Sequence, residues 1–191
     1  MRPAVLLLAF AVCNAAPPAK PVPAPDPLAA LEASAARQAR RGAFGASSDA
    51  YRRMAALGPT SPARCRWQVA VFNNTLAAGN KRDQVEELLR FAALDRTFAA
   101  DWTVPADAKQ ACHRALHDTL AEVVYIWNKE MTMGCTAYSW DKWPLLETLF
   151  HEFLADFPGD PWAPEARRQL ERLQRLKAGE SRSAIDQEAK R

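Results

Sequence analysis

Glycine is scarce in this chain, with only seven among its 191 residues. A glycine-rich phosphate-binding loop is absent, as are the G-x-S-x-G turn of many hydrolases and the paired C-x-x-C motif of zinc sites. Catalytic residues are often carried on loops, and so little glycine leaves few loops to carry them. We therefore predict that the protein is not an enzyme and has no cofactor.

The chain also lacks the period-two alternation of apolar and polar residues that indicates a β-sheet. After the N-terminus, no apolar run approaches the about 20 residues that a membrane-spanning helix requires. Hydrophobic residues make up 49% of the chain and charged residues 25%, which is an ordinary composition for a globular domain. These features predict an all-α domain that is soluble or peripherally attached to a membrane.

Acidic residues are sparse in one stretch, although the net charge of the whole chain is only +3. A charge this small requires no polyanionic partner, so we predict no nucleic-acid binding. Between residues 37 and 66 there is a single acid, Asp49, and seven arginines: Arg37, Arg40, Arg41, Arg52, Arg53, Arg64 and Arg66. Such a run is typical of a solvated face. The alternative is an adaptor that binds phosphates or acidic protein surfaces.

The first residues have the order of a secretory signal peptide, with a charge at Arg2, an apolar run from Pro3 to Val12, and small residues after it. Cleavage after Ala15 or Ala16 fits the pattern best. We predict a signal peptide over residues 1–16 and export to the periplasm or the outer-membrane-associated cell envelope. Cys13 provides an alternative, a lipoprotein whose acylated cysteine attaches it peripherally to a membrane.

Composition divides the mature chain into four parts. Residues 17–27 contain six prolines and predict a stiff polyproline II spacer. Residues 28–58 are rich in arginine and alanine and predict short helices, the second of them capped by Ser48 or Asp49. Residues 59–178 carry apolar stripes at helical spacing and predict a helical repeat domain. Residues 179–191 form a charged tail.

The last two predicted helices have the most definite pattern. The first begins at Ser139 or Asp141, and a tight turn at Pro158–Pro161 joins it to the second. Because the turn is short, the helices must run antiparallel and in contact. Their apolar stripes should face each other; they consist of Phe150, Phe153, Leu154 and Phe157 on one side and Ala166, Leu170 and Leu173 on the other.

The segment from Leu149 to Pro158, followed by Trp162, Ala166 and Leu170, resembles the tetratricopeptide repeat. In that family an aromatic residue precedes a helix-ending proline by eight positions, as Phe150 precedes Pro158. The segments 65–68, 73–76, 81–85 and 124–130 also resemble envelope repeat proteins of gliding bacteria. The resemblance extends over about residues 61–176. It implies antiparallel helical hairpins stacked as a short tetratricopeptide-like solenoid.

The same resemblance implies a function: an exported protein-binding scaffold or assembly factor of the bacterial envelope, with other envelope proteins as partners. Trp140 and Trp143, beside Tyr138, are the predicted exposed anchors for such a partner. The sequence predicts no oligomeric state.

The alternative function is a small exported metal-binding protein or enzyme. His113 and His117 lie four residues apart on one predicted helix, so both side chains can face one ion, with Asp118 or His151 completing the site. Arg114 stands where the catalytic glutamate of an H-E-x-x-H motif would be, and two histidines at this spacing are common in long helices. The sequence therefore favours no metal site.

Three cysteines remain after the signal peptide, and an exported protein is expected to oxidise at least one pair. Cys65 and Cys112 both lie on apolar helix faces, and we predict a disulfide between them. Cys112 with Cys135 is the competing pair.

Overall fold

The computed structural model describes residues 26–133 and 142–179, and within these ranges every regular element is an α-helix. The helices are α1 (Pro27–Arg40), α2 (Phe44–Leu57), α3 (Arg64–Ala78), α4 (Lys81–Ala100), α5 (Ala106–Met133), α6 (Trp143–Asp156) and α7 (Ala163–Lys177). The predicted all-α class is confirmed. In these ranges no helix is both long and apolar enough to cross a membrane.

Local chemistry accounts for several helix ends. The side chain of Asp26 accepts a hydrogen bond from the backbone N–H of Leu28, and a proline occupies the first turn of α1. Gly79 ends α3 in the left-handed conformation, at φ 80°, which costs glycine little. The Asn80 side chain then accepts from two backbone N–H groups and starts α4.

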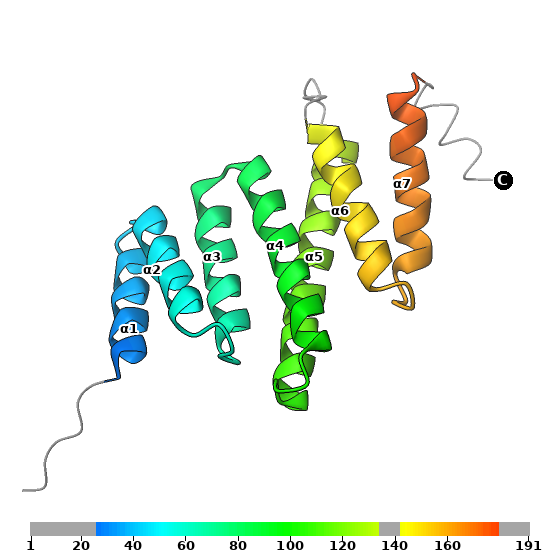
Figure 1. Ribbon diagram of the computed structural model, residues 1–191. Helices are drawn as coiled ribbons and strands as arrows, with labels where there is room; N and C mark the ends of the chain where they lie inside the picture. Colours follow the sequence, from blue (N-terminus) through cyan, green and yellow to red (C-terminus); the bar gives the residue numbers. More distant parts are fainter. Residues whose placement is uncertain (1–25, 134–141, 180–191) are drawn as a thin grey trace, which may run out of the picture.

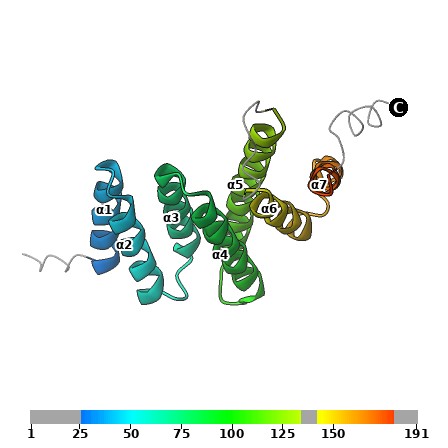
Figure 2. The same cartoon turned by 90° about the horizontal axis from the view of Figure 1, so that it is seen from above.

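The helices follow one another across the molecule in chain order, each packed against the next (Figure 1). From above, α2 lies to one side of α1, and α4 lies to the same side of α3 (Figure 2). α4 also contacts α6, and Arg96 of α4 binds Glu152 and Asp156 of α6. The arrangement is a repeat-like stack of antiparallel helical hairpins.

α3 is buried on two faces because it lies between two hydrophobic clusters. Trp67 and Val71 pack in a small cluster with side chains of α1 and α2. Cys65 and Phe72 pack in a large cluster that extends to α7. α2 thus joins the stack directly, across the predicted boundary between residues 58 and 59.

The large cluster contains the side chains that the sequence predicted to face each other in the last hairpin. Phe150, Phe153 and Phe157 are buried there, with Ala166, Leu170 and Leu173 of α7, and Leu154 packs against them. The two stripes meet because the turn at residues 158–161 is too short for any but an antiparallel arrangement.

The predicted start of the second helix was wrong. α2 begins at Phe44, and Ser47 and Ser48 are buried inside it rather than capping its end. Their hydroxyl groups accept hydrogen bonds from the Asn74 side chain of α3, so both serines are satisfied inside the helix. This contact joins residues 26 and 27 positions apart, and a local sequence pattern does not reveal it. Ser139 and Asp141, the signal peptide with Cys13, the spacer up to residue 25, and the tail from residue 180 lie outside the described residues.

Candidate functional site

A groove runs between α2 and α4, with α3 as its floor. It consists of two cavities, of about 340 and 200 Å³, both lined by Arg52 of α2 and Arg90 of α4. The floor residues of α3 repeat every three or four positions, so they share one helix face: Arg64, Trp67, Gln68, Val71, Asn74, Thr75 and Ala78. At 1.5 Å per residue the floor is about 21 Å long. The groove exists because α3 holds α2 and α4 apart.

A buried carboxylate lies at the centre of this groove. The Glu87 side chain, only 4% exposed, accepts a hydrogen bond from Arg52 Nη2 at 2.7 Å and is also bound by Arg90. Gln68 Nε2 donates to its other oxygen at 2.9 Å. Burial raises the pKa of Glu87, but the hydrogen bonds from Gln68 and Arg52 and the two guanidinium charges outweigh burial, so its pKa is lowered. One ionised group therefore joins α2, α3 and α4.

The two ends of the groove differ in charge. The larger cavity, beside Asn74, is lined by three acids, Asp83, Glu86 and Glu87, as well as by the two shared arginines. The smaller cavity has a third arginine, Arg64, and none of the residues that line it is acidic. A bound segment would therefore meet acidic groups at one end of the groove and guanidinium groups at the other.

Little in the sequence pointed to this groove. Arg52 and Arg64 belong to the arginine run between residues 37 and 66. Glu87, which binds Arg52 and Gln68, is distant in the chain, 35 residues from Arg52 and 19 from Gln68. Only the packing of α2 against α3 and of α3 against α4 brings these side chains together.

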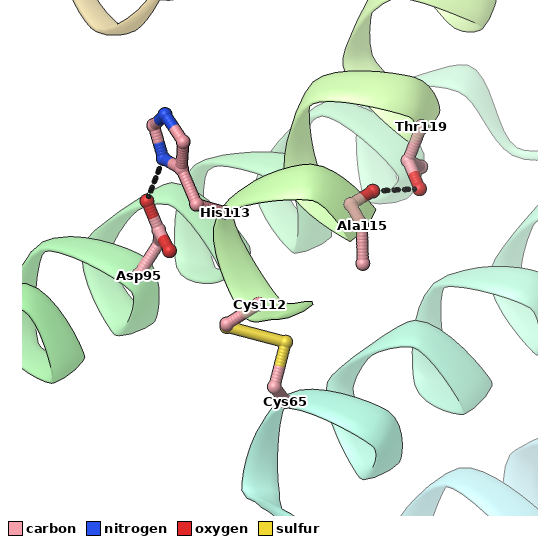
Figure 3. Close-up of a disulfide and its surroundings, with 6 residues drawn as sticks. All are labelled: Cys65, Asp95, Cys112, His113, Ala115 and Thr119. Atoms are coloured by element: carbon pink, nitrogen blue, oxygen red, sulfur yellow. Dashed lines mark hydrogen bonds and ion pairs between the residues drawn. A yellow bond between two sulfur atoms is a disulfide. The ribbon is translucent and has the colours of Figure 1, made fainter. Parts of the chain in front are cut away.

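The two histidines of the predicted alternative each bind carboxylates (Figure 3 shows the bond between His113 and Asp95). His113 Nδ1 lies 2.8 Å from Asp95 of α4. The ring nitrogens of His117 lie 3.0 Å from Asp118 and 2.7 Å from Asp160. The ring of Phe157 lies 4.8 Å from His113 and 5.0 Å from His117, between centroids. In the described ranges no three side chains of the metal-binding kinds form a cluster.

His117 should make stability depend on pH. The hydrogen bond to Asp118 raises its pKa above 6.5, burial opposes this, and Asp160 raises it further. Because the pKa of His117 is raised in the folded state, the protonated ring stabilises the fold fully below pH 6.5. This stabilisation is lost as the pH rises through the pKa that His117 has in the folded protein. We expect His117→Gln to remove up to about 1 kcal/mol of stability at pH 5.5, since the ring is partly exposed, and much less at pH 8.5.

Urea unfolding of the wild type and the variant at both pH values measures this difference. Asn73→Ala, at an exposed position on α3, removes no titratable group and is the control, which should change stability equally at both pH values. Equal destabilisation by His117→Gln at both pH values would contradict the assigned role of this ion pair.

Trp143 does not form the predicted exposed anchor. It is 5% exposed and belongs to the large hydrophobic cluster. The physical reason is helical phase: Trp143 is the first residue of α6, and Leu146, Leu149 and Phe150 bury the same face. Tyr138 and Trp140 lie outside the described residues. The most exposed large apolar side chain in the described part is Trp102, at 90%.

The floor helix of the groove is joined to α5 by a disulfide. Cys65 of α3 and Cys112 of α5 have Cα atoms 5.5 Å apart and bonded sulfur atoms (Figure 3). Both residues are buried, Cys65 at 7% and Cys112 at 0% exposure. Cys135, the competing partner of Cys112, lies outside the described residues.

Comparison with models of protein families, with characterised proteins and with solved structures finds no match for this chain. The likeness to the tetratricopeptide repeat therefore stays a prediction from its residues.

Proposed function

We propose that this protein is an exported scaffold that binds other proteins of the cell envelope, and that the groove between α2 and α4 holds a segment of the partner. The observation that carries the proposal is the pair of cavities aligned along one face of α3. Export is supported by the signal-like order of residues 1–16.

The shape of the groove favours an extended peptide segment as its ligand. Small-molecule sites are usually a single concave pocket of about 300–1,000 Å³. Here two cavities, of about 340 and 200 Å³, lie along the floor helix instead. An extended segment rises about 3.3 Å per residue, so roughly six residues would cover the about 21 Å floor. Their side chains would alternate between the cavities and solvent.

The walls of the groove are suited to binding without large rearrangement. Both walls are helices, and the ion pair between Arg52 and Glu87 connects them directly, while Gln68 of the floor donates to the same carboxylate. A pre-formed groove spares a ligand the free-energy cost of ordering the protein, so more of the contact energy remains as affinity.

Photo-crosslinking tests this proposal. A photoreactive amino acid replaces Ala78 at one end of the groove or Ala55 at the other. We expect the same envelope protein to be captured from both positions. Ala77 is the matched control, because it is exposed on α3 and does not line either cavity.

A second variant checks that capture reports occupancy of the groove. Ala78→Trp adds a large side chain at an exposed position and should reduce capture from position 55 at least tenfold, whereas Ala77→Trp should not. Equal capture from positions 77 and 78, or different proteins from the two ends, would reject the groove as the binding site.

A further inference from the structure

We infer that the Arg64 end of the groove binds a carboxylate of the partner segment; this rests on the proposed function of the groove. The first observation is the charge of the smaller cavity. Its lining includes three guanidinium groups, from Arg52, Arg64 and Arg90, and no carboxylate. Fixed positive charges beside apolar walls favour an anionic ligand group.

Arg64 is the guanidinium that is available to such a ligand. Arg52 binds Asp49 and Glu87, and Arg90 binds Glu86 and Glu87. The Nη1 atom of Arg64, in contrast, donates to the backbone carbonyl of Pro59 at 2.7 Å, and no carboxylate pairs with Arg64 in the described part of the chain. Arg64 is also the first residue of α3, where the helix dipole favours an anion.

Two buried donors in the lining lack an acceptor. Trp67 is 3% exposed, and its indole Nε1–H has no hydrogen-bond partner among the described residues. The same holds for the Nε–H of Arg64. Both residues line the smaller cavity. A buried donor without an acceptor destabilises a protein. Both donor atoms are themselves buried, so a ligand reaches them only if the side chains shift. A carboxylate, which accepts several hydrogen bonds and donates none, is then the group that suits two donors beside an arginine.

The remaining lining residues indicate what accompanies the carboxylate. Tyr51, Val71 and Leu94 form apolar walls of the same cavity, so the ligand group should carry an apolar side chain next to its carboxylate. A C-terminal apolar residue has this chemistry, and so does an internal aspartate or glutamate beside an apolar residue. The acids at the other end of the groove then orient the segment, with its carboxylate toward Arg64 and any basic group toward Asp83.

Titration of the mature full-length protein with small probes tests the carboxylate. The probes are N-acetylleucine, which carries a C-terminal carboxylate, N-acetylaspartate amide, which carries a side-chain carboxylate, and N-acetylleucine amide, which carries none. The readout is the indole N–H signal of Trp67 in a ¹⁵N-correlation NMR spectrum, assigned with Trp67→Phe. We expect at least one carboxylate probe to shift this signal saturably at millimolar concentration. N-acetylleucine amide should bind at least tenfold more weakly than that probe.

Two arginine variants make the test specific. Arg64→Gln should weaken binding of the carboxylate probe at least tenfold. Arg66→Gln should leave it unchanged, because Arg66 pairs with Glu32 at 2.8 Å and does not line the cavity. The tighter of the two carboxylate probes identifies the source as a chain terminus or a side chain. Equal binding of the amide, equal weakening by both variants, or no saturable shift would overturn the inference.

The outcome is separable from that of the proposed function. Cross-links from positions 55 and 78 without binding of a carboxylate probe would reject the carboxylate site at Arg64 and leave the groove as the binding site for a partner. Carboxylate binding without cross-links to a common envelope protein would reject the scaffold function and keep the site.

Discussion

Phe153→Ala is expected to lower the free energy of unfolding by about 3–5 kcal/mol, the usual cost of truncating a fully buried phenylalanine. Phe153 has no exposed surface. Its ring lies 5.7 Å from Phe157 and 5.2 Å from Trp162, between centroids, so it fills the space between α6 and the start of α7. Truncation would leave a cavity that these two aromatic neighbours are too rigid to close.

The loss is a large fraction of the total, because domains of this size are stable by only about 5–15 kcal/mol. Urea unfolding followed by circular dichroism measures it. Leu57→Ala is the control, since Leu57 is 66% exposed and should change stability little. A Phe153→Ala protein that unfolds at the same urea concentration as the wild type would contradict the packing of the last hairpin.

Removing the disulfide should have a comparable effect. The bond closes a loop with a sequence separation of 47, and in the chain-entropy model such a loop stabilises the folded state by about 4 kcal/mol. The double variant Cys65→Ala with Cys112→Ala is therefore expected to lose about this much stability. Unfolding of the oxidised wild type and of the double variant, without reductant, gives the difference.

The same bond ties α3, the floor helix of the groove, to α5. Because α3 otherwise makes few contacts with α5, the disulfide is the main direct connection between these two helices. Cys135→Ala is the control, and should leave the Cys65–Cys112 bond intact.

Mass spectrometry of the protein isolated from its native cells checks the chemistry behind this expectation. Non-reducing peptide mapping should find Cys65 bonded to Cys112, and the mature chain should begin near Ala16 or Pro17. Free thiols at both positions, or a chain that starts at Met1, would contradict the bond and the export that favours it. A lipid on Cys13 would instead establish the lipoprotein alternative.

The helices were predictable because their signals are local. Gly79 and Asn80 mark the end of α3 and the start of α4, and an asparagine or glycine at a helix end acts on backbone groups within a few residues. The stripe of Phe150 and Phe153 repeats at the period of a helix, and the short turn after it leaves one arrangement for α7.

Side-chain environments were less predictable, and Trp143 shows why. The sequence places it in a stretch rich in turn-forming and aromatic residues, which is typical of an exposed loop. Its burial depends on the first turn of α6 starting at this residue, in phase with Leu146. A shift of one or two residues in a helix start turns a side chain from the core to solvent, and helix starts are the least certain feature of a sequence.

By itself, the sequence determined an all-helical chain and the antiparallel pairing of α6 with α7, because hydrophobic period and short turns act over a few residues. Only the tertiary structure decided where a partner could bind. The groove needs α3 to separate α2 from α4, and its central Glu87 takes donors from α2, α3 and α4. Contacts between residues 19 and 35 positions apart depend on how whole helices pack, and no local pattern in the chain encodes that packing.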